Sequence, residues 1–170
     1  MAMRIDLSKT RKTLLTIRRP HLARMIERAA EAAGLDDVSR LSLRLVDPGF
    51  IAGVNAEFVG HEGPTDVITF DYRDDSDEPD DDTPQAELLV CPALAAERAA
   101  EMKCHPSREL VLYIVHGLLH LAGHDDGDPT QRKAMRAAER RVLKTLSKEF
   151  DLDATFDFQA CVKRQELKSL

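Results

Sequence analysis

Four short stretches of the chain have the hydrophobic pattern of strands. Met3 to Leu7 and Leu41 to Leu45 alternate apolar with polar residues, the period of two that places one side of a strand in a core. Val67 to Tyr72 and Glu87 to Cys91 are further strand-forming runs, and an acidic segment separates them. The pattern therefore predicts a small sheet of about four strands.

Five segments have the pattern or the start signals of helices. In Pro20 to Ala33 apolar residues recur every three or four positions, and Gly34 follows as a stop signal. Three further helices are expected to begin at a proline, at Pro48, Pro92 and Pro129, because proline is accepted at the first helical position. Ser107 is expected to cap the fifth helix. Besides 20–33, helices are expected at 48–58, 92–103, 108–122 and 129–150. Segregated strands and helices predict an α+β fold in which about five helices pack on a small mixed β-sheet.

The length and composition indicate one domain. With 170 residues, 43% of them hydrophobic, the chain suffices for one core and is short for two. We expect the domain to span residues 1–150 and residues 151–170 to be a C-terminal extension, for which the pattern predicts no structure. No apolar run approaches the roughly 18–20 residues of a membrane span, and the first residues lack the apolar stretch of a signal peptide. A cytoplasmic protein without a membrane partner is expected.

The charge is distributed unevenly. Eight of the twelve residues from Asp71 to Asp82 are acidic, which is typical of a solvated loop. The alternative is that this loop repels nucleic acid or contacts a basic ribosomal protein. The last long helix is basic, with Arg132, Arg136 and Arg140 on it. Such a stripe is either an ordinary solvated face or a contact for an RNA backbone.

Two histidines indicate the chemistry. His116 and His120 are four residues apart, so they share one face of a helix that is apolar on all sides and therefore buried and central. Two such imidazoles can bind one ion, although a single buried histidine is more often a hydrogen-bonded core residue. Gly123 ends the helix, and the chain can then bring Asp126 to a third position. Three protein ligands leave one position open for water, as catalysis requires.

The neighbouring residues limit the reaction. His124 is the rival third ligand, but it directly follows Gly123, and the turn is expected to aim it away from the ion. Zinc proteases carry a general-base glutamate directly after the first histidine, and this chain has Gly117 there. Peptide hydrolysis is therefore disfavoured. A phosphodiester is the alternative substrate, since a metal ion can neutralise charge that develops on phosphate oxygens.

With these residues in place, the sequence resembles the YbeY family of bacterial ribosomal-RNA maturation endoribonucleases. The family signature, close to H-G-x-L-H-L-x-G-Y-D-H, is similar to the segment from His116 to Asp126. A second signature, N-x-x-[FY]-R-G followed by P-T-D-V-L-[ST]-F, is similar to Asn55–Gly60 and Pro64–Phe70. Ala86–Cys91 resembles the family's strand before the metal helix, and Arg132, Met135 and Glu139 fit the final helix. The resemblance covers roughly residues 40 to 147.

The resemblance implies an α+β fold, one zinc-like ion on His116, His120 and Asp126, and cleavage of single-stranded RNA at that site. It also implies ribosomal RNA and the small ribosomal subunit as partners, with roles in 16S rRNA 3′-end maturation and ribosome quality control. The bond that is cut and the oligomeric state stay open.

Two positions depart from the family pattern. Asp126 replaces a histidine, and a site with a carboxylate admits Mn²⁺ or Mg²⁺ more readily than three imidazoles would. Mn²⁺ or another divalent ion is therefore the alternative to Zn²⁺. Val59 stands where the family has an arginine that contacts the scissile phosphate, and valine supplies neither charge nor a hydrogen bond. His61 or Arg73 is the alternative cation.

Two carboxylates in the second signature have open roles. Asp66 or Glu57 either orients a ligand histidine through its second ring nitrogen or, for Asp66, organises a strand end. Three functions therefore compete: a metal-dependent endoribonuclease, which we favour, a non-enzymatic metal-stabilised ribosome assembly factor, and a metalloprotease.

Overall fold

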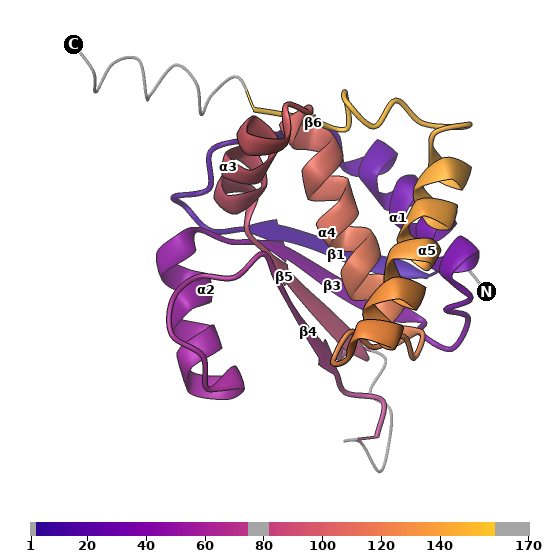
Figure 1. Ribbon diagram of the computed structural model, residues 1–170, viewed down its shortest axis with the longest axis horizontal. Helices are drawn as coiled ribbons and strands as arrows, with labels where there is room; N and C mark the ends of the chain where they lie inside the picture. Colours follow the sequence, from indigo (N-terminus) through magenta and orange to yellow (C-terminus); the bar gives the residue numbers. More distant parts are fainter. Residues whose placement is uncertain (1–2, 75–81, 159–170) are drawn as a thin grey trace.

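A four-stranded mixed sheet forms the centre of the protein (Figure 1). The structure is a computed structural model that describes residues 3–74 and 82–158. The strand order is β1-β3-β5-β4, in which β1, β3 and β5 run parallel and β4 runs antiparallel to β5. The strands are β1 (Arg4–Lys9), β3 (Arg40–Leu45), β4 (Val67–Asp71) and β5 (Ala86–Val90). Because β4 is an edge strand, one of its sides is open to other groups.

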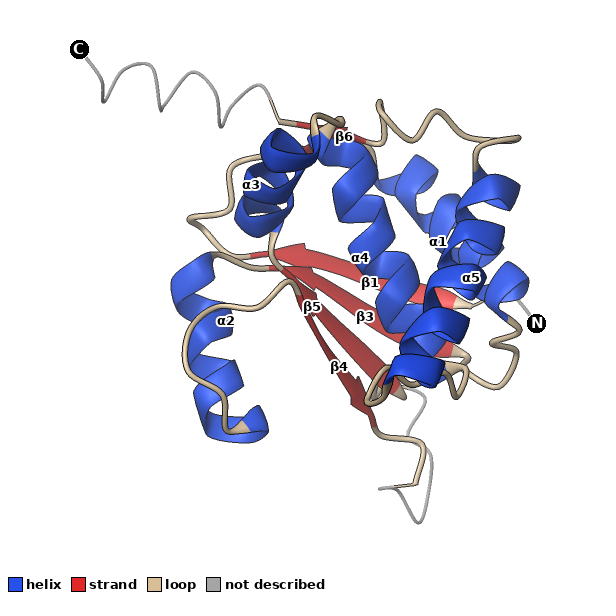
Figure 2. Ribbon diagram, in the orientation of Figure 1, coloured by secondary structure: helices blue, strands red, loops and turns tan. Residues whose placement is uncertain are grey.

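Five α-helices lie on the two faces of this sheet (Figure 2). Four of them gather on one face, and α2 packs on the other through Ile51, which joins Ile68 and Leu89 in a small separate core. A short π-helix, η1, continues α2 directly. The helices are α1 (Arg19–Ala33), α2 (Pro48–Val54), η1 (Asn55–Val59), α3 (Pro92–Met102), α4 (Pro106–Leu121) and α5 (Pro129–Leu146). The predicted α+β architecture is confirmed.

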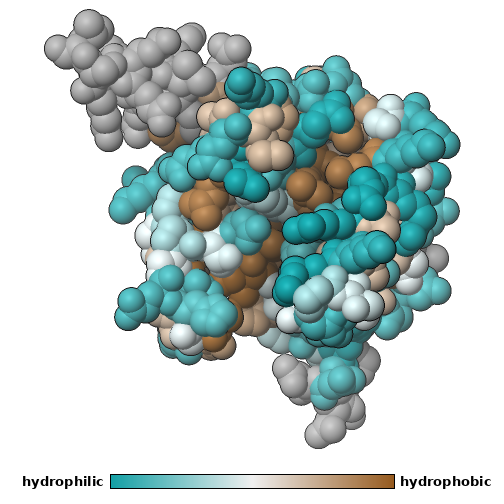
Figure 3. All heavy atoms as spheres, in the orientation of Figure 1, coloured by the Kyte–Doolittle hydropathy of each residue, from teal (hydrophilic) through white to brown (hydrophobic). Residues whose placement is uncertain are grey.

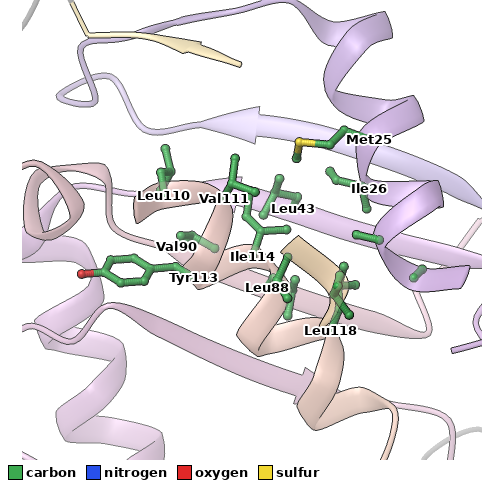
Figure 4. Close-up of a cluster of buried hydrophobic side chains, with 14 of the residues drawn as sticks. Met25, Ile26, Leu43, Leu88, Val90, Leu110, Val111, Tyr113, Ile114 and Leu118 are labelled. Carbon is green, nitrogen blue, oxygen red and sulfur yellow. The ribbon is translucent and has the colours of Figure 1, made fainter. Parts of the chain in front are cut away.

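Helix α4 is the central helix. It contacts α1, α3 and α5 as well as β4 and β5. Figure 4 shows Ile114 and Leu118 of α4 among side chains of α1, β3 and β5, including Met25, Leu43 and Leu88. These residues are fully buried, and each buried aliphatic side chain contributes about 1.5–3 kcal/mol. The packing makes α4 a rigid support for the residues at its C-terminal end.

The start signals in the sequence are correct for three helices and wrong for one. Pro92 is the first residue of α3. Asp47 caps α2 by accepting a hydrogen bond from the Phe50 amide, and Asp128 forms a capping box with Gln131. Ser107 does not cap α4. The cap is His105, whose ring nitrogen accepts the Ser107 amide, and Pro106 is the first helical residue. Helix α5 also ends at 146 rather than near 150, in a turn that spans 147–149.

The segment after α5 has a structure that the sequence did not predict. Leu152, Phe156 and Phe158 are buried and belong to the main core. Strand β6 (Phe156–Asp157) pairs antiparallel with β2 (Thr16–Ile17). Ser107 explains the attachment, because its hydroxyl donates to the Leu152 carbonyl at 2.7 Å and accepts the Phe156 amide at 3.0 Å. Residues 151–158 are therefore packed against the start of α4.

Two segments singled out in the sequence lie partly outside the residues that the structure describes. The acidic segment 71–82 lies partly outside the described residues, which omit 75–81. Residues 159–170 of the expected C-terminal extension also lie outside them. Among the helices of the described part, none combines the length and the apolar character that crossing a membrane requires.

Candidate metal centre

Three donor atoms converge beyond the last turns of α4. The Nε2 atoms of His116 and His120 lie 3.0 Å apart, and the carboxylate oxygens of Asp126 lie 3.5 Å and 3.8 Å from them. Within the described residues, these three side chains form the one group of histidine, cysteine or acidic residues with the spacing of a metal site. Ligand atoms of a tetrahedral zinc site, with bonds of about 2.0–2.1 Å, lie roughly 3.3–3.4 Å from one another. The donor set therefore fits one divalent ion.

Glu139 of α5 holds the other side of the His116 ring. Its Oε1 lies 2.7 Å from His116 Nδ1, so Nδ1 of the ring donates a hydrogen bond to Glu139. The lone pair of Nε2 is then free to bind an ion between the three candidate ligands. Burial lowers the pKa of His116, but the hydrogen bond and charge of Glu139 and the charge of Asp126 outweigh it, and the pKa is raised. Carboxylates that stabilise an imidazolium also favour a bound cation. Such an outer carboxylate is a common part of histidine metal sites.

The turn after α4 separates Asp126 from its rival. The Gly123 amide bonds the His120 carbonyl and the His124 amide bonds the Leu119 carbonyl, both at 3.0 Å. This is the Schellman pattern, and Gly123 has the positive φ of 93° that it requires. His124 is therefore committed to the turn through its backbone and is not among the three converging side chains.

Arg132 braces the loop that carries Asp126. Its guanidinium donates to the carbonyls of Asp126 and Gly127 at 3.2 Å and 3.4 Å. Arg136 and Arg140 are exposed on the same helix, and Glu139 lies between them in sequence. The basic stripe of α5 thus runs beside the candidate metal centre.

Gly117 packs against the sheet, which explains its presence after His116. A Cβ atom on Gly117 would lie 2.7 Å from Leu88 Cδ2 and 3.2 Å from Thr69 Oγ1. Leu88 is fully buried, so a side chain on Gly117 would have to displace a packed core residue. The position that carries the general-base glutamate in zinc proteases is therefore closed to any side chain here.

Two cavities meet at His116. The first, which we call the metal groove, has a volume of 570 Å³ and runs from the three candidate ligands along β4 to η1. Val59, Asn55 and the nearby His61 line its far end. The second, which we call the acidic cleft, has a volume of 590 Å³ and lies between α3 and α4. Glutamates 97, 101, 109 and 139 line it with Arg98, which is paired with Glu101 at 2.9 Å.

Burial in the acidic cleft raises the pKa of two side chains. It raises the pKa of Glu109 and, together with the neighbouring charges of Glu109 and Asp66, the pKa of Tyr113. The carboxyl groups of this cleft therefore oppose further negative charge there.

The carboxylates of the second signature lie in different places. Asp66 lines both cavities, and its Oδ1 accepts the Val67 amide at 2.9 Å and the Thr65 hydroxyl at 3.1 Å. It thus organises the start of β4, one of the two roles that the sequence left open. Glu57 is exposed on η1.

The two alternative cations are also distinguished. Arg73 is committed elsewhere, because it pairs with Asp71 and Asp37 and donates to the Leu121 carbonyl at 2.8 Å. His61 is exposed and lines the metal groove together with Val59. Of the two, only His61 lies where it can face a substrate in that groove.

Glu139 is the residue to which sequence reasoning gave no role in the site. The available signal was its isolation, since it is the single acidic residue between Arg132 and Lys148 on a basic helix. An acidic residue that interrupts a positive face indicates a specific partner. The sequence could not say which histidine it meets, because α4 and α5 come together only in the fold.

Together, the fold and this donor set define a class of protein: an α+β domain whose central helix presents a group of residues that could bind a metal ion at its C-terminal end. The family model described as Endoribonuclease YbeY matches residues 7–147. The chain therefore belongs to the YbeY family.

Individual relatives agree with this assignment. A protein named Endoribonuclease YbeY from Rhodopirellula baltica is 39% identical over 79% of this chain, and one from Salinispora tropica is 32% identical over 68% of it. The matches span 67%, 65% and 64% of the relatives from R. baltica, Cutibacterium acnes and Frankia casuarinae, about two thirds of their length. The solution structure of TM1509 from Thermotoga maritima has a TM-score of 0.57 and 27% identity, covering 85% of this chain and 90% of that one.

Proposed function

We propose that this protein is a metal-dependent endoribonuclease that cleaves single-stranded RNA. The substrate is the 3′ end of 16S rRNA, so the partners are ribosomal RNA and the small ribosomal subunit in the cytoplasm. The observation that carries the proposal is the convergence of His116, His120 and Asp126 within hydrogen-bonding or near-contact distance at the wall of an open groove. The description of the family to which the chain belongs, Endoribonuclease YbeY, supports cleavage of RNA.

The three converging residues would hold the ion, which we take to be Zn²⁺, with Mn²⁺ or another divalent ion as the alternative. When bound, it supplies positive charge to a phosphodiester and acidifies water. Glu139 orients His116 and keeps its proton on Nδ1. Arg132 restrains the Asp126 loop through two backbone carbonyls. These contacts preorganise the donors before any substrate arrives.

Charge selects the side from which RNA approaches. The acidic cleft presents carboxyl groups of α3 and α4, which repel a phosphate backbone. The metal groove is the remaining approach to His116 and His120. Exposed Arg136 and Arg140 on α5 flank the site and are proposed to contact phosphates outside the groove.

A second candidate function rests on Val59. It lines the groove where the resemblance implies an arginine, so a non-enzymatic ribosome assembly factor stabilised by metal remains the competing proposal. A metalloprotease is disfavoured further by Gly117, because its contact with Leu88 leaves no room for a glutamate.

The experiment is cleavage of single-stranded RNA that spans the end of small-subunit rRNA, compared with the same sequence in a duplex. The protein is tested as purified, after chelation, and after Zn²⁺ or Mn²⁺ is restored, with His120→Ala as the matched variant. We expect cleavage of the single strand alone, its loss on chelation, and its recovery with metal only in the wild type.

Three outcomes distinguish the candidates. Metal binding without RNA cleavage supports the assembly factor. Cleavage that survives both chelation and His120→Ala contradicts the metal site. Cleavage of a peptide substrate with the same metal dependence would restore the protease.

A further inference from the structure

An exposed aromatic side chain lies next in the chain to Val59, a residue that lines the far end of the metal groove. Phe58 of η1 is 65% exposed and its neighbour Val59 is 46% exposed. In the described part of the chain, Met102 of α3 is the other large hydrophobic side chain with comparable exposure, at 60%. Burial against the core therefore does not account for Phe58.

Packing holds the Phe58 ring in place although most of the side chain is exposed. It meets Phe70 of β4 edge to face, with ring centroids 5.8 Å apart and an interplanar angle of 86°. Phe70 is in turn stacked on Tyr72, with centroids 6.0 Å apart and an angle of 4°. An aromatic ring fixed in this way loses little entropy when a second flat group stacks on it.

The same elements connect this ring to the candidate metal centre. Val59, next to Phe58, lines the metal groove, and so do Thr69 and Asp71, the neighbours of Phe70 in β4. The two aromatic side chains themselves lie outside the lining of the groove. Asn55 donates to the Gly63 carbonyl at 2.9 Å, and its own carbonyl accepts the His61 amide. These bonds tie η1 to the following loop and so fix the position of Phe58 relative to the groove. Figure 3 shows apolar surface in the hollow between α2 with η1 and α5.

Charge complementarity does not explain how this groove would hold RNA. Asp66, Asp71 and Asp126 are among its lining residues, and none of the described lining residues is lysine or arginine. The lining side chains that can carry a positive charge are histidines, namely His61 and the two candidate ligands His116 and His120. Away from the ion, contacts to bases are therefore the remaining source of affinity in the groove. Stacking of bases on aromatic side chains is the main such contact for single strands.

We propose that Phe58 is a stacking platform for one nucleobase of the single-stranded RNA, just beyond the end of the metal groove that is remote from His116 and His120. The occupant is a base rather than a phosphate, because the ring is apolar and none of the described lining residues of the groove is lysine or arginine. Phe58 is a binding residue that sets where the strand lies and takes no part in bond cleavage. The inference rests on the proposed function.

Single-turnover cleavage of a short single-stranded RNA by the metal-loaded protein tests this. Phe58→Ala is expected to raise the half-saturating protein concentration roughly 5- to 150-fold, as the loss of one stacked base predicts, with little change in the maximal rate. Phe58→Trp should restore binding and Phe58→Leu should not, because leucine is apolar but has no π-face. Met102→Ala is the matched control of equal exposure and should behave as wild type.

Replacing one nucleotide at a time by an abasic residue locates the base. One position should weaken binding to the wild type and leave binding to Phe58→Ala unchanged, the coupling expected of two groups in contact. Cleavage by Phe58→Ala with wild-type saturation overturns the stacking proposal and leaves the nuclease intact. Equal losses in Phe58→Ala and Phe58→Trp also overturn it, because they would mean that η1 is merely distorted. Failure of the wild type to bind or cleave RNA refutes the proposed function and this inference together.

Discussion

Glu139 and Asp126 contact opposite sides of the His116 ring, and each decides one property of the candidate site. Glu139 determines which nitrogen of His116 is protonated, and Asp126 adds the negative charge that two imidazoles lack. Both are carboxylates, yet only Asp126 is close enough to His120 to complete a set of donors. The two carboxylates therefore differ in role only because of where they lie: Asp126 is a candidate ligand, and Glu139 orients one.

Asp126→Ala should lose more metal affinity than His124→Ala. The Asp126 carboxylate lies within 3.5 Å of His116 Nε2, while His124 is held by the turn, so the aspartate variant should lose at least the 10–100-fold typical of outer residues. Competition titration with a chelating dye measures both. A larger loss in His124→Ala would refute the ligand set.

Glu139→Ala should weaken metal binding by about 10–100-fold without removing a ligand. The reason is that His116 loses its acceptor and samples the tautomer in which Nε2 carries the proton. Glu139→Gln keeps an acceptor oxygen and should fall between alanine and wild type. Nitrogen NMR of the His116 ring in the metal-free protein reports the tautomer independently of activity, and an unchanged Nδ1 proton in the alanine variant would contradict the assignment.

Val59→Arg should accelerate RNA cleavage. Val59 lines the groove with the candidate ligands, and one well-aimed donor is worth about 2.7–4 kcal/mol where it has been removed from other enzymes. Only part of that is expected, since the supporting contacts are absent. The comparison is made at equal metal loading. High wild-type activity that arginine leaves unchanged would assign the role to another cation, with His61 as the first to test.

At the scale of elements, α4 and β4 determine the site through close packing. Gly117 lets α4 approach β5 and β4 so closely that Leu88 and Thr69 fill the space of a side chain. This contact places the histidines directly above the open edge of β4, where the metal groove begins.

Gly117→Ala should therefore lower the free energy of unfolding, by about 1–3 kcal/mol as expected of overpacking. Alanine favours a helix by about 1 kcal/mol over glycine, which reduces the loss but does not cancel the clash with Leu88. Gly53→Ala in α2 is the control, because nothing lies within 4 Å of its added Cβ, and it should be neutral or stabilising. Urea unfolding compares the two, and equal midpoints would mean that the core near Leu88 yields freely.

At the scale of the whole molecule, the segment after α5 anchors the N-terminal end of α4. Its aromatic and aliphatic residues enter the main core, and Ser107 bonds its backbone twice. The site lies at the opposite end of the same helix. The position of the histidines thus depends on contacts far from them in space.

Phe156→Ala should cost about 3–5 kcal/mol, the usual range for a buried phenylalanine, because Phe156 is 2% exposed. Met102→Ala, at an exposed position, should stay within about 0.5 kcal/mol of wild type. Thermal unfolding with metal absent measures both, so that binding does not mask the change. A small effect of Phe156→Ala would mean that residues after 150 add little to the core.

The sequence by itself determined the four strands of the sheet, the five helices and the pairing of His116 with His120. These depend on periodicity, proline and glycine, which act between residues close together in the chain. It also anticipated Gly123 as the stop that allows Asp126 to return, since a positive φ is a local requirement.

Only the tertiary structure decided which carboxylate meets His116 and why Gly117 carries no side chain. It also decided that Ser107 bonds the segment after α5 and that Phe58 stays exposed. Glu139 is 23 residues from its partner in sequence, and Ser107 is 45 residues from Leu152. Contacts of that separation depend on how helices and strands pack, and a residue's own type and neighbours do not specify them. Chain-local signals thus gave the elements and the three candidate ligands, whereas the surroundings that orient those ligands arose from packing.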